Sequence, residues 1–139
     1  MATMRLNWVG PLLLCREELE RIPLCISGVY LLHATAPALG GYATFYAGKT
    51  EDLRRRLLQH VGPRSTKASI RAAQEIDATY WSAAPVEDAD FLGPIESGLI
   101  RLLNPVCNGQ VPVATPVYVN LPPLSFKTFL NEETPTYVH

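Results

Sequence analysis

Two neighbouring, mostly apolar stretches are rich in residue types that favour β-strands, which predicts a pair of strands whose side chains point alternately to the two faces. The first stretch covers residues 27–33 and the second covers residues 44–48. Residues 34–43 between them include a proline and two adjacent glycines, which indicates a loop. Two strands joined in this way are expected to pair as an antiparallel hairpin. The pairing would bring Tyr30 of the first strand close to Tyr46 of the second.

The remaining segments mostly show the period of an α-helix, in which residues three and four apart share a face. Helices are predicted at residues 15–21, 50–61, 67–74 and 91–104, and a third strand at residues 75–83. Thr50 is a suitable cap for the second helix, and Gly62 and Pro63 are expected to end it. Asn104, which precedes a proline, is expected to end the last helix.

The order β-β-α-α-β-α predicts an α/β protein of the α+β sandwich type: a small three-stranded antiparallel sheet flanked by helices. In the first strand, Tyr30 and Leu32 are expected on one face of the sheet, and Val29 and Leu31 on the other. No βαβ unit with a glycine-rich phosphate loop is present, which excludes a Rossmann fold. We divide the chain into an N-terminal extension with a short helix (1–26), a core domain (27–108) and a Pro-rich C-terminal arm (109–139) that packs on it.

Composition is typical of a soluble globular protein, with 47% hydrophobic and 18% charged residues in 139. No apolar run is long enough to span a bilayer, and the apolar run 9–15 resembles a signal peptide poorly because charged residues follow it directly. The three cysteines, Cys15, Cys25 and Cys107, lack the spacing of a disulfide framework or a zinc site. We therefore expect a cytoplasmic protein without a membrane partner.

Charge is distributed unevenly along the chain. The formal net charge is −1, but residues 49–71 carry +5 and the remainder carries −6. A local basic patch of this kind can hold a polyanion such as nucleic acid. A solvated helical face is the alternative interpretation. The residues expected to contact nucleic acid are Arg54, Arg55, Arg64, Lys67 and Arg71.

Three charged residues occupy unusual positions on the predicted helices. Arg56 and His60 are four residues apart, so they lie on one helical face at the edge of the apolar stripe. A cation there is suited to binding phosphate, although Arg56 extending over the core and His60 capping the helix is the alternative. Glu96 projects into the apolar arc of the last helix, while Ser97 and Gly98 are expected to face away. A buried carboxylate requires a cation or a metal ion, and the sequence leaves both open.

The order of these residues resembles the GIY-YIG nuclease family. Gly28-Val29-Tyr30 corresponds to the first motif, Tyr46-Ala47-Gly48 to the second, and Arg56 follows Gly48 by eight residues. Lys49, Glu96 and Asn108 also stand where the family pattern places them, and His60 resembles the restriction-enzyme-like branch. The departures are valine at position 29 and alanine at position 47, both apolar replacements for isoleucine. The resemblance covers residues 27–108.

The resemblance implies a metal-dependent endonuclease that hydrolyses DNA by in-line attack of water at a single metal ion. Glu96 would hold Mg²⁺, with Mn²⁺ as a possible substitute. Tyr30 would act as general base or orient the water, and Lys49 and His60 are rival bases that the sequence does not separate. We expect cationic neighbours to favour the phenolate form of Tyr30.

The remaining implied roles concern the substrate. Arg56 would grip the phosphate, Tyr46 would hydrogen-bond phosphate or water, and Asn108 would orient a neighbour or contact the DNA backbone. DNA is the expected partner, and a cut through both strands would need a homodimer or sequential nicking by one chain. A stand-alone domain of this kind suggests restriction or a mobile element.

Two other functions remain open at the level of sequence. One is a catalytically silent nucleic-acid-binding module that uses the basic segment 49–71. The other is a protein-interaction domain in which Glu96 forms a structural ion pair with Arg56.

Overall fold

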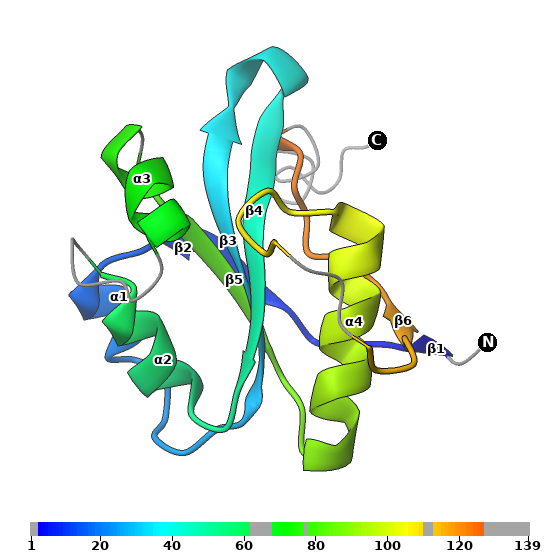
Figure 1. Ribbon diagram of the computed structural model, residues 1–139. Helices are drawn as coiled ribbons and strands as arrows, with labels where there is room; N and C mark the ends of the chain where they lie inside the picture. Colours follow the sequence, from blue (N-terminus) through cyan, green and yellow to red (C-terminus); the bar gives the residue numbers. More distant parts are fainter. Residues whose placement is uncertain (1–2, 62–67, 77, 110–112, 127–139) are drawn as a thin grey trace, which may run out of the picture.

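The computed structural model describes residues 3–61, 68–76, 78–109 and 113–126. Its centre is an antiparallel sheet with the strand order β2-β5-β3-β4 (Figure 1). The strands are β2 (Val9–Leu13), β3 (Gly28–Ala36), β4 (Gly41–Thr50) and β5 (Tyr80–Pro85). The helices are α1 (Arg16–Leu19), α2 (Leu53–Gln59), α3 (Ala68–Ile76) and α4 (Leu92–Leu103), with short 3-10 turns η1 (Pro37–Leu39) and η3 (Ala89–Phe91). Two further short strands, β1 (Thr3–Met4) and β6 (Tyr118–Val119), pair in parallel.

Helices cover both faces of the sheet, with α1, α2 and α3 on one side and α4 on the other (Figure 1). The predicted alternation along β3 is confirmed. Tyr30 and Leu32 belong to the core beneath the first group of helices, whereas Val29 and Leu31 pack in the core beneath α4. The predicted α+β class is therefore confirmed, and each face of β3 contributes to a separate core.

The predicted count of three strands is wrong because β2 adds a fourth strand to the sheet. The run that forms β2 contains Pro11 and a register shift, so it lacks a regular alternation. Proline has no N–H to donate, which makes it acceptable only where one side of the strand is unpaired. β2 meets this condition, since it lies at the edge of the sheet next to β5.

Several boundaries also differ from the prediction. The third strand was expected over 75–83, but α3 continues to Ile76 and β5 begins at Tyr80. The β-branched residues Ile76 and Thr79 favoured a strand over this stretch. The helical period that begins at Ala68 nevertheless continues to Ile76, so Ile76 belongs to α3. The predicted loop 34–43 is shorter, because both hairpin strands extend toward the turn at Pro37–Gly40. Asp52, rather than Thr50, caps α2 by accepting a hydrogen bond from the backbone of Arg55.

Residues 114–117 of the C-terminal segment pack against α4. Ser97 donates a hydrogen bond from Oγ to the Ala114 carbonyl at 2.8 Å, and the Val117 amide donates to the Pro94 carbonyl at 2.9 Å. The Val117 carbonyl lies so close to Gly98 that a Cβ there would collide with it. Ser97 and Gly98 are consequently buried, which corrects the expectation that they face away. Of the helices within the described ranges, none is long and apolar enough to cross a membrane.

Candidate functional site

The β3–β4 hairpin brings two tyrosines together, as the sequence predicted. Tyr30 pairs with Gly48 across the two strands, and the ring centroids of Tyr30 and Tyr46 are 6.0 Å apart. The ring of Tyr30 lies over Gly48, because a Cβ added there would be 2.5 Å from the phenol oxygen. Only glycine leaves this space, so Gly48 fixes where the hydroxyl of Tyr30 lies.

Helix α2 adds Arg56 and His60 to this pair of tyrosines. The Nε of Arg56 donates a hydrogen bond to the Tyr30 hydroxyl oxygen at 3.3 Å, and the same oxygen lies 3.0 Å from Nε2 of His60. Arginine has only donors, so the Tyr30 oxygen accepts from Arg56, and its own proton can go to His60 or to Tyr46, with which Tyr30 also forms a side-chain hydrogen bond. Donation from Tyr30 to Nε2 requires a neutral His60 ring with its proton on Nδ1. Burial, assisted by the charge of Arg56, lowers the pKa of His60 to about 4, in agreement with a neutral ring.

The tyrosine at the centre of this cluster remains a neutral phenol. Burial raises the pKa of Tyr30 well above its ordinary value of 10, and the neighbouring Tyr46 raises it further. Arg56 lowers the pKa as predicted, but burial outweighs it. The expected effect of Arg56 on the phenolate is therefore confirmed in direction, but burial decides the net shift in the surroundings that the chain itself supplies. Nε2 of His60, 3.0 Å from the Tyr30 oxygen, is a candidate acceptor for a proton that leaves Tyr30.

Arg56 is held by neutral groups. Its Nη1 donates to Oε1 of Gln59 at 2.7 Å, and it also forms a side-chain hydrogen bond with Tyr46. Among the described residues, ion pairs within 4.0 Å join only Arg16 to Glu20 and Arg21 to Glu18. A structural Glu96–Arg56 pair, on which the protein-interaction alternative depended, is thus absent from the described part of the chain. Sequence reasoning missed Gln59, although its position three residues after Arg56 on one helix was a usable signal.

Glu96 of α4 and Lys49 of β4 form a second group, on the face of β4 opposite to Tyr46. Lys49 extends from β4 toward α4, where its Nζ lies 3.6 Å from the position a Cβ of Gly93 would take. Glu96 lies one turn further along α4 and is half-buried. Burial raises the pKa of the Glu96 carboxyl, whereas the charge of Lys49 lowers it. The predicted site is therefore divided by the edge strand β4, with Tyr46 on one side and Lys49 on the other.

A single carboxylate is the protein ligand available at this edge for a cation. The described residues contain no group of three or more His, Cys, Asp or Glu side chains that could hold a metal ion. Magnesium keeps several of its waters and commonly binds through one or two carboxylates together with phosphate oxygens. Glu96, which has no ion pair within 4.0 Å among the described residues, fits such a site.

Asn108 supports β4 from outside the sheet. Its Oδ1 accepts from the Ala47 amide at 2.9 Å, and its Nδ2 donates to the Ala47 carbonyl at 2.8 Å. The Cys107 amide also donates to the Phe45 carbonyl at 2.9 Å. Asn108 thus takes the place of a neighbouring strand between Tyr46 and Gly48. Of its two predicted roles, these contacts support orienting a neighbour.

Only some of the residues predicted to contact nucleic acid lie in the described part of the chain. Arg54 and Arg55 lie on α2, where Arg55 is exposed and Arg54 is partly exposed. Arg64 and Lys67 lie outside the described residues. Arg71 belongs to α3, but its side chain is not among those described.

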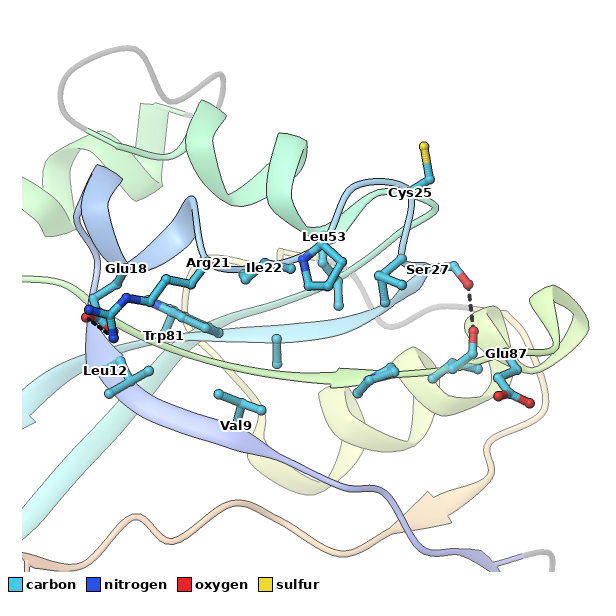
Figure 2. A pocket seen from close by; sticks show the side chains of 15 residues that line it. Val9, Leu12, Glu18, Arg21, Ile22, Cys25, Ser27, Leu53, Trp81 and Glu87 are labelled. Atoms are coloured by element: carbon cyan, nitrogen blue, oxygen red, sulfur yellow. Dashed lines mark hydrogen bonds and ion pairs between the residues drawn. The ribbon is translucent and has the colours of Figure 1, made fainter.

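A cavity of about 690 Å³ lies away from all these residues. Figure 2 shows it between the segment that connects α1 to β3 and the strands β2 and β5. Glu18, Arg21 and Trp81 lie at one end, and Ser27 and Glu87 at the other. None of the predicted site residues lines this cavity. The hydrogen bonds that converge on Tyr30 mark the candidate site instead.

Comparisons with known proteins agree with this fold. No model of a known protein family matches the chain, and no curated protein sequence matches it. Among solved structures, a match is found to the GIY-YIG N-terminal endonuclease domain of UvrC from Thermotoga maritima, a point mutant bound to its catalytic divalent cation. The TM-score is 0.52 at 20% sequence identity, and the match covers 68% of this chain and 94% of that domain. The chain therefore has the fold of GIY-YIG nuclease domains, as its motifs predicted.

Proposed function

We propose that this protein is a metal-dependent endonuclease that hydrolyses phosphodiester bonds in DNA. The observation that carries the proposal is the Arg56 guanidinium, which is oriented by neutral partners only and has no carboxylate within 4.0 Å among the described residues. A cation that is fixed in place and not neutralised is suited to a phosphate. The resemblance in fold to a nuclease domain supports the same activity.

The residues proposed to take part in hydrolysis lie on both faces of β4. On the α2 face, Arg56 engages the non-bridging phosphate oxygens, where negative charge accumulates. Tyr30 orients the attacking water and passes a proton to Nε2 of His60, which lies 3.0 Å from its oxygen. Tyr46 hydrogen-bonds the phosphate. Lys49, on the α4 face, is the rival base.

Glu96 is the residue that would hold the divalent cation. Bound there, Mg²⁺ or Mn²⁺ would stabilise negative charge on the phosphoryl oxygens as a Lewis acid. In this proposal the scissile phosphate lies at β4, the strand whose two faces carry these groups. Residues 27–108 supply all seven proposed site residues. The spacing of Arg56 and His60 supports a role in restriction or in a mobile element.

Cleavage assays test the proposal. Supercoiled plasmid and a labelled single-stranded oligonucleotide are incubated with Mg²⁺, with Mn²⁺ and with chelator, beside a folded Glu96→Gln variant. We expect metal-dependent cleavage that the variant lacks. Conversion of plasmid to nicked circles would indicate action by one chain, whereas direct linearisation that rises steeply with protein concentration would indicate a dimer. Failure of the folded protein to cut either substrate, with retained DNA binding, would favour the silent binding module.

A further inference from the structure

The contacts around Arg56 involve one residue to which no role has been given. Arginine carries five N–H donors in a rigid planar fork, so two hydrogen bonds to different nitrogens fix the orientation of the plane. At Arg56, Nε donates to Tyr30 at 3.3 Å and Nη1 donates to Oε1 of Gln59 at 2.7 Å. The contact to Gln59 is the shorter of the two.

The chemical nature of Gln59 is as important as its position. Its amide oxygen accepts a hydrogen bond but carries no net charge. A carboxylate at the same position would pair with Arg56 and repel a phosphate, whereas an aliphatic side chain would leave Nη1 without its acceptor. An amide supplies orientation and leaves the charge of Arg56 available to a substrate.

We propose that Gln59 is a positioning residue that aligns the guanidinium of Arg56 for an incoming phosphate while leaving its charge uncompensated. The proposal rests on the nuclease activity proposed above. Gln59 itself touches no reacting atom, and it acts through Arg56. Because both residues lie on α2 and are three positions apart, the alignment is built into one helix and requires no movement of the sheet.

Two substitutions separate orientation from charge. Gln59→Leu keeps the approximate size but removes the acceptor, and Gln59→Glu keeps an acceptor but adds a negative charge. We expect Gln59→Leu to lower kcat about tenfold with little change in KM, because a misaligned charge stabilises the transition state less well. We expect Gln59→Glu to raise KM about tenfold and to reduce the salt dependence of DNA binding by roughly one counterion. Wild-type kinetics in Gln59→Leu, or identical kinetic changes in the two variants, would overturn the proposal.

A spectroscopic measurement tests the contact independently of activity. In ¹H–¹⁵N spectra of arginine side chains, the Nη1 protons of Arg56, from which Oε1 of Gln59 accepts, should exchange slowly with water, and their signal is assigned from its loss in Arg56→Lys. We expect exchange to quicken about tenfold in Gln59→Leu and to stay slow in Gln59→Glu. An unchanged exchange rate in Gln59→Leu would overturn the positioning role. If the wild-type protein does not cut DNA, the nuclease proposal fails, and this spectrum still decides whether Gln59 orders Arg56.

Discussion

Two histidines in this protein are equally buried but belong to different kinds of network. His33 on β3 and His60 at the end of α2 both have no exposed surface, and the pKa of each is lowered to about 4. The ring nitrogens of His33 lie 2.9 Å from the Thr44 hydroxyl and 2.8 Å from the Ser82 hydroxyl. His60 instead contacts Tyr30, whose oxygen accepts a hydrogen bond from Arg56.

The difference lies in where each network ends. Burial alone lowers the pKa of His33, and its two neutral hydroxyl partners satisfy both ring nitrogens. The network of His60 ends at a half-buried cation whose charge also contributes to the lowered pKa. Burial and a perturbed pKa are thus shared by a structural and a proposed catalytic histidine. The distinguishing feature is a charged group that still has donors to offer a substrate.

Removing Arg56 should make the His60 network as neutral as that of His33. We expect Arg56→Ala to lower the rate of DNA cleavage by at least about 10³-fold, because the guanidinium stabilises the charge that accumulates on the phosphate. The control is Arg21→Ala, which removes an exposed arginine that has only a surface ion pair. Single-turnover cleavage measures both. A loss of similar size in the two variants would contradict the role of Arg56.

Acid should weaken both regions through their histidines. Because the pKa of each histidine is lower in the folded state than its ordinary value of 6.5, the unfolded state binds more protons between pH 6.5 and about 4. The free energy of unfolding should therefore fall as the pH falls through this range, by roughly 3 kcal/mol for each histidine. Urea unfolding at pH 7, 5.5 and 4.5 measures the change.

The variant His33→Asn separates the two histidines in this titration. It should remove about one proton from the pH dependence of stability, and the remainder should be due mainly to His60. A pH dependence that does not change in the variant would show that His33 is not buried in a neutral form.

Two glycines offer a smaller, local test of the proposed site. A Cβ at Gly48 would lie 2.5 Å from the Tyr30 oxygen, whereas one at Gly93 would approach the Lys49 amine only to 3.6 Å. We expect Gly48→Ala to destabilise the fold by about 2 kcal/mol and to reduce cleavage by displacing Tyr30. Gly93→Ala should be neutral or slightly stabilising, since alanine favours helices. Denaturant unfolding compares the two, and equal effects would show that the Tyr30 ring is not confined.

The smallest expected effect concerns Arg55, which is exposed on α2. Arg55→Gln should weaken DNA binding about twofold and lower the salt dependence by about one counterion, with kcat unchanged. Fluorescence anisotropy with a labelled duplex at several salt concentrations measures this change. A lowered kcat would place Arg55 in the reaction instead.

Local periodicity was sufficient to predict the parts of the site that depend on single elements. The period of two placed Tyr30 on one face of β3, and the hairpin loop implied its proximity to Tyr46. The helical period placed Arg56 and His60 together on α2. These relations depend on backbone geometry within one strand or helix, so they can be read without knowledge of the fold.

Features that depend on distant segments could not be predicted in this way. The burial of Ser97 and Gly98 depends on residues 113–119, which lie beyond α4 in the chain. The two hydrogen bonds between the Asn108 side chain and the Ala47 backbone join residues far apart in sequence, and no local pattern predicts them. The sign of the pKa shift at Tyr30 depends on how deeply its oxygen is buried, which is decided by packing against the helices.

The comparison of the two histidines can be tested by one experiment. Single-turnover cleavage of supercoiled plasmid with Mg²⁺ is measured for the wild type, His60→Ala and His33→Ala, each corrected for its folded fraction. We predict a rate about 10²-fold below wild type for His60→Ala, which loses the proton acceptor of Tyr30, and a rate close to wild type for His33→Ala. Equal rates for His60→Ala and the wild type, or an equal loss in both variants, would contradict a proton path from Tyr30 to His60.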